Sequence, residues 1–123
     1  MAMAVTVTEE TSWSIKKIKF AWTSAANGTA TGTTTKAFTG EILQLVTVPG
    51  SAGNQPTNLY DITITDQDGI DVLNGQGANR SNVNTEQVVG SLAGLRCVVN
   101  DKLTINVSIA GDTKQGTAYL YIR

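Results

Sequence analysis

The sequence predicts an all-β protein, a single-domain antiparallel β-sandwich of Greek-key or jelly-roll type with an extended N-terminal arm. First, apolar residues recur at alternate positions along most of the chain, and a helical period is rare. Second, Thr, Gly, Asn and Ser dominate the polar composition, which favours strands and turns over helices. Third, about eight short strands follow one another at intervals of roughly 8 to 15 residues, and no segment is long enough for a helical crossover.

The N-terminal segment is predicted to be an arm that extends away from the domain. Val5 and Val7 alternate with threonines, and two glutamates separate this stretch from the apolar residues that follow. Such a strand adds more easily to the exposed edge of a neighbouring molecule than to its own domain. The 123 residues are therefore divided into an arm, residues 1–11, and one sandwich domain, residues 12–123.

The strand pattern continues over residues 13–22 but changes phase near residues 16–17. Either a β-bulge at these two lysines or a break between two strands explains the change. After it, the alternation predicts that Phe20 and Trp22 face the core and that Lys19 faces the solvent.

The next segments contain two predicted strands and a loop. Residues 31–38 are rich in β-forming side chains. Residues 41–48 are apolar at both parities, which is typical of a central strand covered on both faces. Residues 49–56 contain two prolines and two glycines, which predict a loop.

An acidic turn follows, with a possible chemical role. Residues 60–65 and 70–73 alternate and predict a hairpin. Between and after them, Asp66, Asp68 and Asp71 resemble part of a calcium loop, but the glycine comes two residues early and no acid stands at the twelfth position. The same carboxylates, with that of residue 61, are numerous enough for a glycosidase pair. Solvated strand faces and a tight hairpin turn explain them more simply.

In the C-terminal part, the pattern of apolar residues is irregular up to about residue 99 and regular after it. The polar tract 74–85 predicts the longest loop. The apolar residues of 88–99 are less periodic, so this stretch holds a short helix or an irregular strand. Residues 103–109 alternate, 111–116 form a turn, and 119–122 form a closing strand.

The residue inventory excludes several classes of function. The net charge is −1 and only 15% of residues are charged, which argues against general binding to nucleic acid or anionic membranes. There is no His and one Cys, so the chain has no internal disulfide, no Ser/His/Asp or Cys/His arrangement and no thiolate–imidazole zinc site. We expect no catalytic residue, cofactor or metal, and Cys97 is expected to be a buried small residue.

One basic cluster stands out, formed by Lys16, Lys17 and Lys19 beside aromatic residues. Basic and aromatic side chains together bind single-stranded nucleic acid in some proteins. Lysines on an exposed strand also discourage edge pairing, and we expect an edge or protein-contact role here.

The N-terminus has no basic region followed by an apolar core, and no stretch approaches the roughly 20 apolar residues of a membrane span. We therefore expect a protein made in a cytoplasm.

Four segments carry a resemblance to a known family: residues 32–43, 55–73, 100–108 and 114–122. Together they resemble small virion proteins encoded among the structural genes of tailed bacteriophages, over roughly residues 18–123. The resemblance implies a β-rich capsid accessory protein of the cement or decoration type, and it implies no catalytic residues. Residues 1–17 fall outside it.

The expected function is that of a structural phage head protein, a capsid cement protein on the capsid surface of the virion, made in the host cytoplasm. Its expected partners are the major capsid protein and copies of itself, with no nucleic acid and no membrane. The alternatives are a head-to-tail or tail component, and a carbohydrate- or receptor-binding β-sandwich module with an exposed Trp/Tyr platform. Besides the loops 49–56 and 74–85, the predicted contact residues are Val5, Val7, Lys16, Lys17, Lys19, Asn54 and Arg80.

Overall fold

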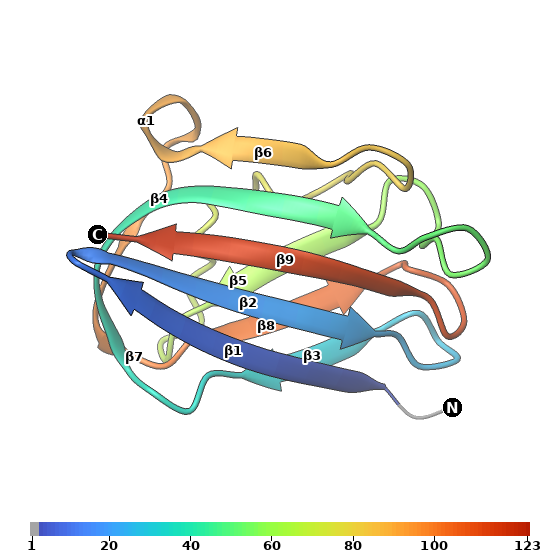
Figure 1. The fold of residues 1–123 in the computed structure, drawn as a ribbon, viewed down its shortest axis with the longest axis horizontal. Coiled ribbons are helices and arrows are strands. Elements are labelled where there is room, and N and C mark those ends of the chain that lie inside the picture. Colours follow the sequence, from blue (N-terminus) through green and yellow to red (C-terminus); the bar gives the residue numbers. More distant parts are fainter. Residues whose placement is uncertain (1–2) are drawn as a thin grey trace.

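The computed structural model describes residues 3–123, which form nine strands and one short helix (Figure 1). Their bounds, in chain order, are β1 Ala4–Ser12, β2 Ile15–Thr23, β3 Ala30–Thr33, β4 Phe38–Pro49, β5 Asp61–Thr65, β6 Glu86–Val89, α1 Gly90–Ala93, β7 Cys97–Asp101, β8 Thr104–Ser108 and β9 Gln115–Ile122.

Two antiparallel sheets pack face to face, which confirms the predicted β-sandwich. The larger sheet has the order β1-β2-β9-β4-β6, and β7 pairs with the first part of β4. The smaller sheet has the order β3-β8-β5. In Figure 1 the larger sheet lies in front of the smaller one. Strand β9 pairs with β2 on one side and with β4 on the other. The C-terminal strand therefore lies at the centre of the large sheet.

The core lies between the two sheets and follows the predicted alternation in β2. Ile18 and Phe20 are 0% exposed and Trp22 is 2% exposed, whereas Lys19 is exposed on the opposite face. The break in the pattern is a turn at Trp13 and Ser14, so that residues 16–17 lie inside β2. Neither a bulge nor a break lies at residues 16–17: β2 pairs with β1 without interruption from Ile15 to Thr23, so Ile15 faces outward, and the break between the strands comes three residues earlier than expected.

The N-terminal arm is not confirmed. Residues 4–12 form β1, which pairs with β2 over its full length as the first arm of a hairpin. Val5 and Val7 are half-buried and pack against the core. Glu10 stands opposite Lys17 in this register and complements its charge, and Glu9 stands opposite Ile18, so the two glutamates do not interrupt the strand. The expected boundary at residue 11 falls inside β1, and Ala2 lies outside the described residues.

Strand β4 is covered on one face only, which corrects the prediction for residues 41–48. Its register with β9 shifts between Ile42 and Gln44, as at a β-bulge. The shift lets Ile42 and Leu45 both face the core although they differ in parity. The outward side chains Val46 and Val48 are half-buried on the open face of the large sheet. The bulge and these outward valines together account for the apolar residues at both parities.

The acidic turn is confirmed. The backbone N–H of Val72 donates to the Ile64 carbonyl at 2.8 Å, but residues 70–73 form only an isolated bridge with Thr65 and not the second strand of the predicted hairpin. The Asp66 carboxylate accepts from the N–H groups of Asp68 at 2.9 Å and Ile70 at 3.0 Å. Gly69 has a φ of 81°, a backbone conformation that glycine adopts without steric cost.

The other predicted elements are present with shifted bounds. Residues 31–38 contain β3, which ends at Thr33, and the start of β4. The less periodic stretch contains both alternatives in succession, the four-residue helix α1 and then β7. Within residues 3–123 no helix is long and apolar enough to cross a membrane.

Candidate interaction surfaces

The carboxylates of the acidic turn bind their own backbone. Asp71 Oδ1 accepts from the N–H groups of Ile64 and Leu73, both at 3.1 Å, and its Oδ2 accepts from Gly75 at 2.9 Å. Asp61 accepts from the N–H of Asn79 at 2.9 Å. In the described part of the chain, no three His, Cys, Asp or Glu side chains are grouped to hold a metal ion. These carboxylates therefore stabilise loop conformation.

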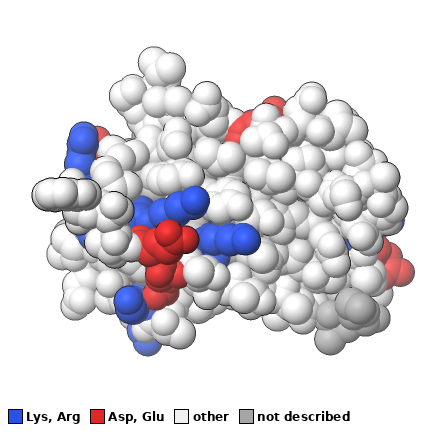
Figure 2. Space-filling model, in the orientation of Figure 1, with Lys and Arg blue, Asp and Glu red and all other residues white. Residues whose placement is uncertain are grey.

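The three lysines of the basic cluster do not form one patch. Lys16 Nζ donates to the Thr39 carbonyl at 2.7 Å. Lys17 Nζ lies 4.9 Å from the ring centroid of Tyr119 and 6.0 Å from that of Tyr121, as in a cation–π contact. Figure 2, which views the open face of the large sheet, shows basic side chains beside acidic ones and a wide uncharged surface around them. This arrangement does not resemble a groove for a nucleic-acid backbone.

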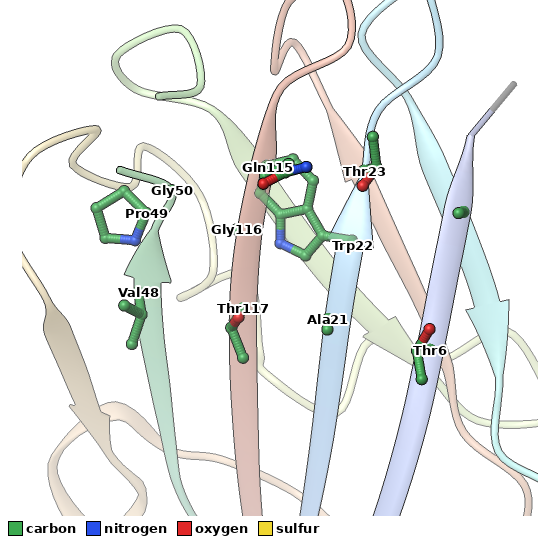
Figure 3. Close-up of a pocket in the computed structure, with 11 residues that line it drawn as sticks. Thr6, Ala21, Trp22, Thr23, Val48, Pro49, Gly50, Gln115, Gly116 and Thr117 are labelled. Carbon is green, nitrogen blue, oxygen red and sulfur yellow. The ribbon is translucent and has the colours of Figure 1, made fainter. Parts of the chain in front are cut away.

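The open face also has a hollow of about 320 Å³ near the start of β9 (Figure 3). Its lining is small and uncharged, and includes Ala21, Thr23, Thr117 and Val48. The Trp22 indole lies behind β9 at Gly116, where an added Cβ would overlap the ring. Trp22 is therefore part of the core, and it does not supply an exposed aromatic platform.

The indole N–H of Trp22, the Thr47 hydroxyl and the Tyr60 phenol are buried polar groups in the core. The rings of Trp22 and Tyr60 are 5.5 Å apart. Burial raises the pKa of the Tyr60 phenol from 10.0 to about 12, and the positive charge of Arg80 opposes this rise. The Thr47 hydroxyl also lowers that pKa, although the two oxygens are not placed for a regular hydrogen bond. Among the described residues, Trp22 Nε1, Thr47 Oγ1 and the Tyr60 hydroxyl all have no hydrogen-bond partner. Tyr60 is a core residue and is not placed to act as an acid or base.

Among the described residues, Trp13 is the most exposed large apolar side chain, and the sequence pattern gave no indication of this. It occupies the first position of the two-residue turn between β1 and β2, at the end of the molecule that also carries the C-terminus (Figure 1). Its side chain is 99% exposed and its φ is 56°. Glycine and asparagine usually occupy such positions, because a bulky residue there is strained.

A second exposed apolar surface follows one edge of the large sheet. We call residues 86–101, which comprise β6, α1 and β7, the edge segment. Leu92 is 89% exposed and Val99 is 72% exposed. Cys97 is also exposed, which corrects the expectation of a buried cysteine. Since Val98 faces the core, its two neighbours in the strand face outward.

The remaining predicted contact residues lie in loops. Asn54 is exposed, and its backbone donates to Ser51 at 2.9 Å and accepts from Gln115 at 2.9 Å. Arg80 is half-buried, with Nη1 3.7 Å from Glu86 Oε1 and Nε donating to a carbonyl two residues earlier. The predicted contact residues are thus dispersed over the interior, the open face and two loops, and do not form one surface.

Comparison with known proteins gives limited information. No family model matches the chain, and no curated protein matches it. A solved structure of a carbohydrate-binding module from the β-sandwich superfamily aligns with 99% of this chain at 16% identity and a TM-score of 0.38. The chain spans about half of that structure, 54% of its length. At this TM-score the likeness carries no conclusion about this chain.

Proposed function

We propose that this chain is a non-catalytic structural protein of tailed-phage heads, a capsid cement protein that contacts major capsid subunits. The observation that carries the proposal is Trp13, an indole in full contact with water at the tip of a rigid hairpin. The resemblance of four sequence segments to small phage virion proteins supports the same role.

The backbone at Trp13 adds to the argument. A non-glycine residue in the left-handed region costs roughly 1 to 2 kcal/mol, and a fully exposed indole gains nothing from burial in its own domain. Tryptophan is also among the side chains that dominate binding energy at protein interfaces. A side chain that is unfavourable for the isolated molecule, and placed at its tip, is well suited to insert into a pocket of a partner.

A cement role depends on the repetition of the same contact at many equivalent sites of a capsid. A single indole and its surroundings make a small contact, but a capsid offers many equivalent sites. A rigid sandwich that binds two neighbouring subunits at once gains effective concentration at the second site. The contribution of this chain is then mechanical and involves no chemical step.

Attachment of Trp13→Asn to capsids tests the proposal. Asparagine tolerates a positive φ, so the variant removes the indole and keeps the turn. Leu59→Asn is the matched control, because Leu59 also has a positive φ, 67°, and is 54% exposed. We expect wild type and Leu59→Asn to cosediment with particles that lack the protein, and Trp13→Asn to be left in the supernatant. Full occupancy by Trp13→Asn would contradict the proposal.

A second candidate function is supported by the open face of the large sheet. Tyr119 and Tyr121 both point outward from β9, and the hollow of about 320 Å³ has uncharged hydroxyl-bearing residues. Such a surface can bind neutral sugars, although Lys17 covers the two rings. Calorimetric titration with neutral oligosaccharides discriminates between the candidates: binding that is lost in Tyr119→Ala and kept in Trp13→Asn favours the sugar-binding module.

A further inference from the structure

Between the two sheets, three buried polar groups need hydrogen-bond partners that the described residues do not supply. Trp22 is 2% exposed, and Thr47 and Tyr60 are fully buried. Within residues 3–123, the indole N–H, the Thr47 hydroxyl and the Tyr60 hydroxyl have no partner. Roughly 90% or more of the buried polar groups in folded proteins are paired with a protein group or with ordered water. Three unpaired groups in one core therefore indicate a partner that is not a protein group.

The three side chains come from both sheets and meet at the inner face of β9. Trp22 stands opposite Gly116 on one side of β9, and Figure 3 shows the indole nitrogen beside this strand. Thr47 stands opposite Ala118 on the other side, at the next inward position. Tyr60 directly precedes β5 of the smaller sheet, and its ring centroid lies 5.5 Å from that of Trp22. The Thr47 hydroxyl is close enough to the phenol to lower its pKa. The three polar groups thus share one region of the core.

The inner face of β9 carries its smallest residues in this region. The indole occupies the place of a side chain at Gly116. Ala118 presents only a methyl group beside Thr47, whereas the next inward pair along the same two strands is Leu120 and Leu45. The smaller pair fills less of the space between the sheets than the two leucines do. An occupant of this space is therefore small.

We propose that one water molecule is bound here, where it accepts from the Trp22 indole N–H and bonds to the hydroxyls of Thr47 and Tyr60. An indole N–H only donates, whereas each hydroxyl both donates and accepts. A water molecule that accepts from the indole keeps two donors and one acceptor for the hydroxyls, so a single molecule pairs all three groups. A buried water molecule makes about three hydrogen bonds in most proteins.

The charges near this region favour a neutral occupant over an ion. The positive charge of Arg80 lowers the pKa of the Tyr60 phenol, and the negative charge of Glu86 raises it. The two charges lie 3.7 Å apart as an ion pair, so they largely offset each other. Burial of an ion without a compensating charge costs far more than burial of a hydrogen-bonded water molecule. A water molecule therefore fits this region better than a cation or an anion.

The bound water then joins the two layers of the sandwich. Trp22 and Thr47 belong to two strands of the large sheet that are separated by β9, and Tyr60 leads into the smaller sheet. Hydrogen bonds from one molecule to all three fix the position of the sheets relative to each other. This role goes beyond the capsid proposal and does not depend on it.

A crystal structure of the full chain tests the site directly. We expect a density peak for one water molecule within about 2.7 to 3.2 Å of Trp22 Nε1, Thr47 Oγ1 and the Tyr60 hydroxyl oxygen. Thr47→Val keeps the shape of the side chain and removes its hydroxyl, so the peak should be lost or displaced in this variant. No peak in the wild type, or a peak that refines as an ion, would overturn the inference.

Urea denaturation gives a second test, because a wet site and a dry site predict effects of opposite sign. With the water bound, Thr47→Val and Tyr60→Phe each remove a hydrogen bond and should each raise the unfolding constant at least about fivefold. In a dry core the same substitutions remove an unpaired polar atom and should lower that constant. Tyr119→Phe is the control, because its hydroxyl is on the open face, and should change the constant by less than about twofold.

The combined results leave no outcome open. Unchanged or higher stability of both Thr47→Val and Tyr60→Phe would show a dry core and contradict the inference. Lower stability of both variants without the density peak would indicate a direct bond between the two hydroxyls, and this result also rules out the water site. Only the peak together with lower stability of both variants supports the bound water.

Discussion

The contact between Trp22 and Gly116 allows a sharp test of the core packing. Gly116 stands opposite Trp22 in the register of β2 and β9, and the indole fills the space that a side chain at 116 would need. Gly116→Ala must displace the ring or the strand, and overpacking of this kind costs roughly 1 to 3 kcal/mol. The structure therefore predicts that this small substitution destabilises the protein.

Removal of the indole reverses the sign of that effect. Trp22 is 2% exposed, so Trp22→Ala is expected to cost about 3 to 5 kcal/mol. The indole N–H has no hydrogen-bond partner among the described residues, which places the cost toward the lower end of this range. In the Trp22→Ala background the added methyl group at 116 enters vacated space, and alanine in a strand is favoured over glycine by about 0.5 to 1 kcal/mol. The two substitutions should thus be non-additive by about 2 kcal/mol or more.

Equilibrium urea denaturation of the four proteins in this cycle provides the measurement, with midpoints compared at constant slope. Lys19→Ala, on the solvent side of the same strand, is the control and should change stability by less than about 0.5 kcal/mol. Additive effects of the two substitutions at 22 and 116, or equal costs at Trp22 and Lys19, would refute the packing described here.

Three further predictions concern single residues. Because the Tyr60 phenol has a higher pKa in the folded protein, its contribution to stability is complete below pH 10 and is lost as pH rises toward 12. Relative to Tyr60→Phe, the wild-type free energy of unfolding should fall by about 1 kcal/mol per pH unit over this range. A constant difference between the two proteins would contradict the burial of the phenol. Asp71→Ala deprives three backbone N–H groups of their acceptor and should cost about 2 to 3 kcal/mol by denaturation, whereas Asp68→Ala at the exposed position should cost less than about 0.5 kcal/mol. Trp13→Asn should leave stability unchanged or raise it by up to about 1 kcal/mol, and a clear loss of stability would show that the indole packs on its own domain.

Alternation was sufficient to predict the strands whose two faces differ. In β2, β5, β8 and β9 the buried positions hold apolar residues or glycine and the outward positions are mostly polar, so period and phase follow from the sequence. The turn between β5 and Val72 was predicted for a similar reason, because Asp and Gly at these positions have specific roles in tight turns.

The failures have physical causes that local patterns do not contain. The alternation of β1 is the same whether it pairs within the molecule or with a neighbour, and the turn that decides this, Trp13 and Ser14, has no Asn-Gly or similar signal. The bulge in β4 changes the parity of a strand in mid-course. In β7, Val98 and Val99 are both apolar, so only the tertiary structure decides which is buried and whether Cys97 is exposed.

The interaction surfaces were the least predictable part. The predicted contact residues were chosen for charge and loop position, and the structure uses several of them internally: Val5 and Val7 pack on the core, and Arg80 pairs with Glu86. Trp13 and Leu92 were missed because exposure of an apolar side chain is a property of the folded surface. Their positions in a hairpin tip and beside an open edge become visible only when the strands are assembled.

The most direct test of the proposed capsid role is the copy number of this chain in purified virions, measured by band densitometry against the major capsid protein. A cement protein that joins capsid subunits should be present at on the order of hundreds of copies per particle, in a fixed ratio to that protein. Absence of the chain from the particle, or a ring-like number of about six or twelve copies as at a connector, would contradict the account.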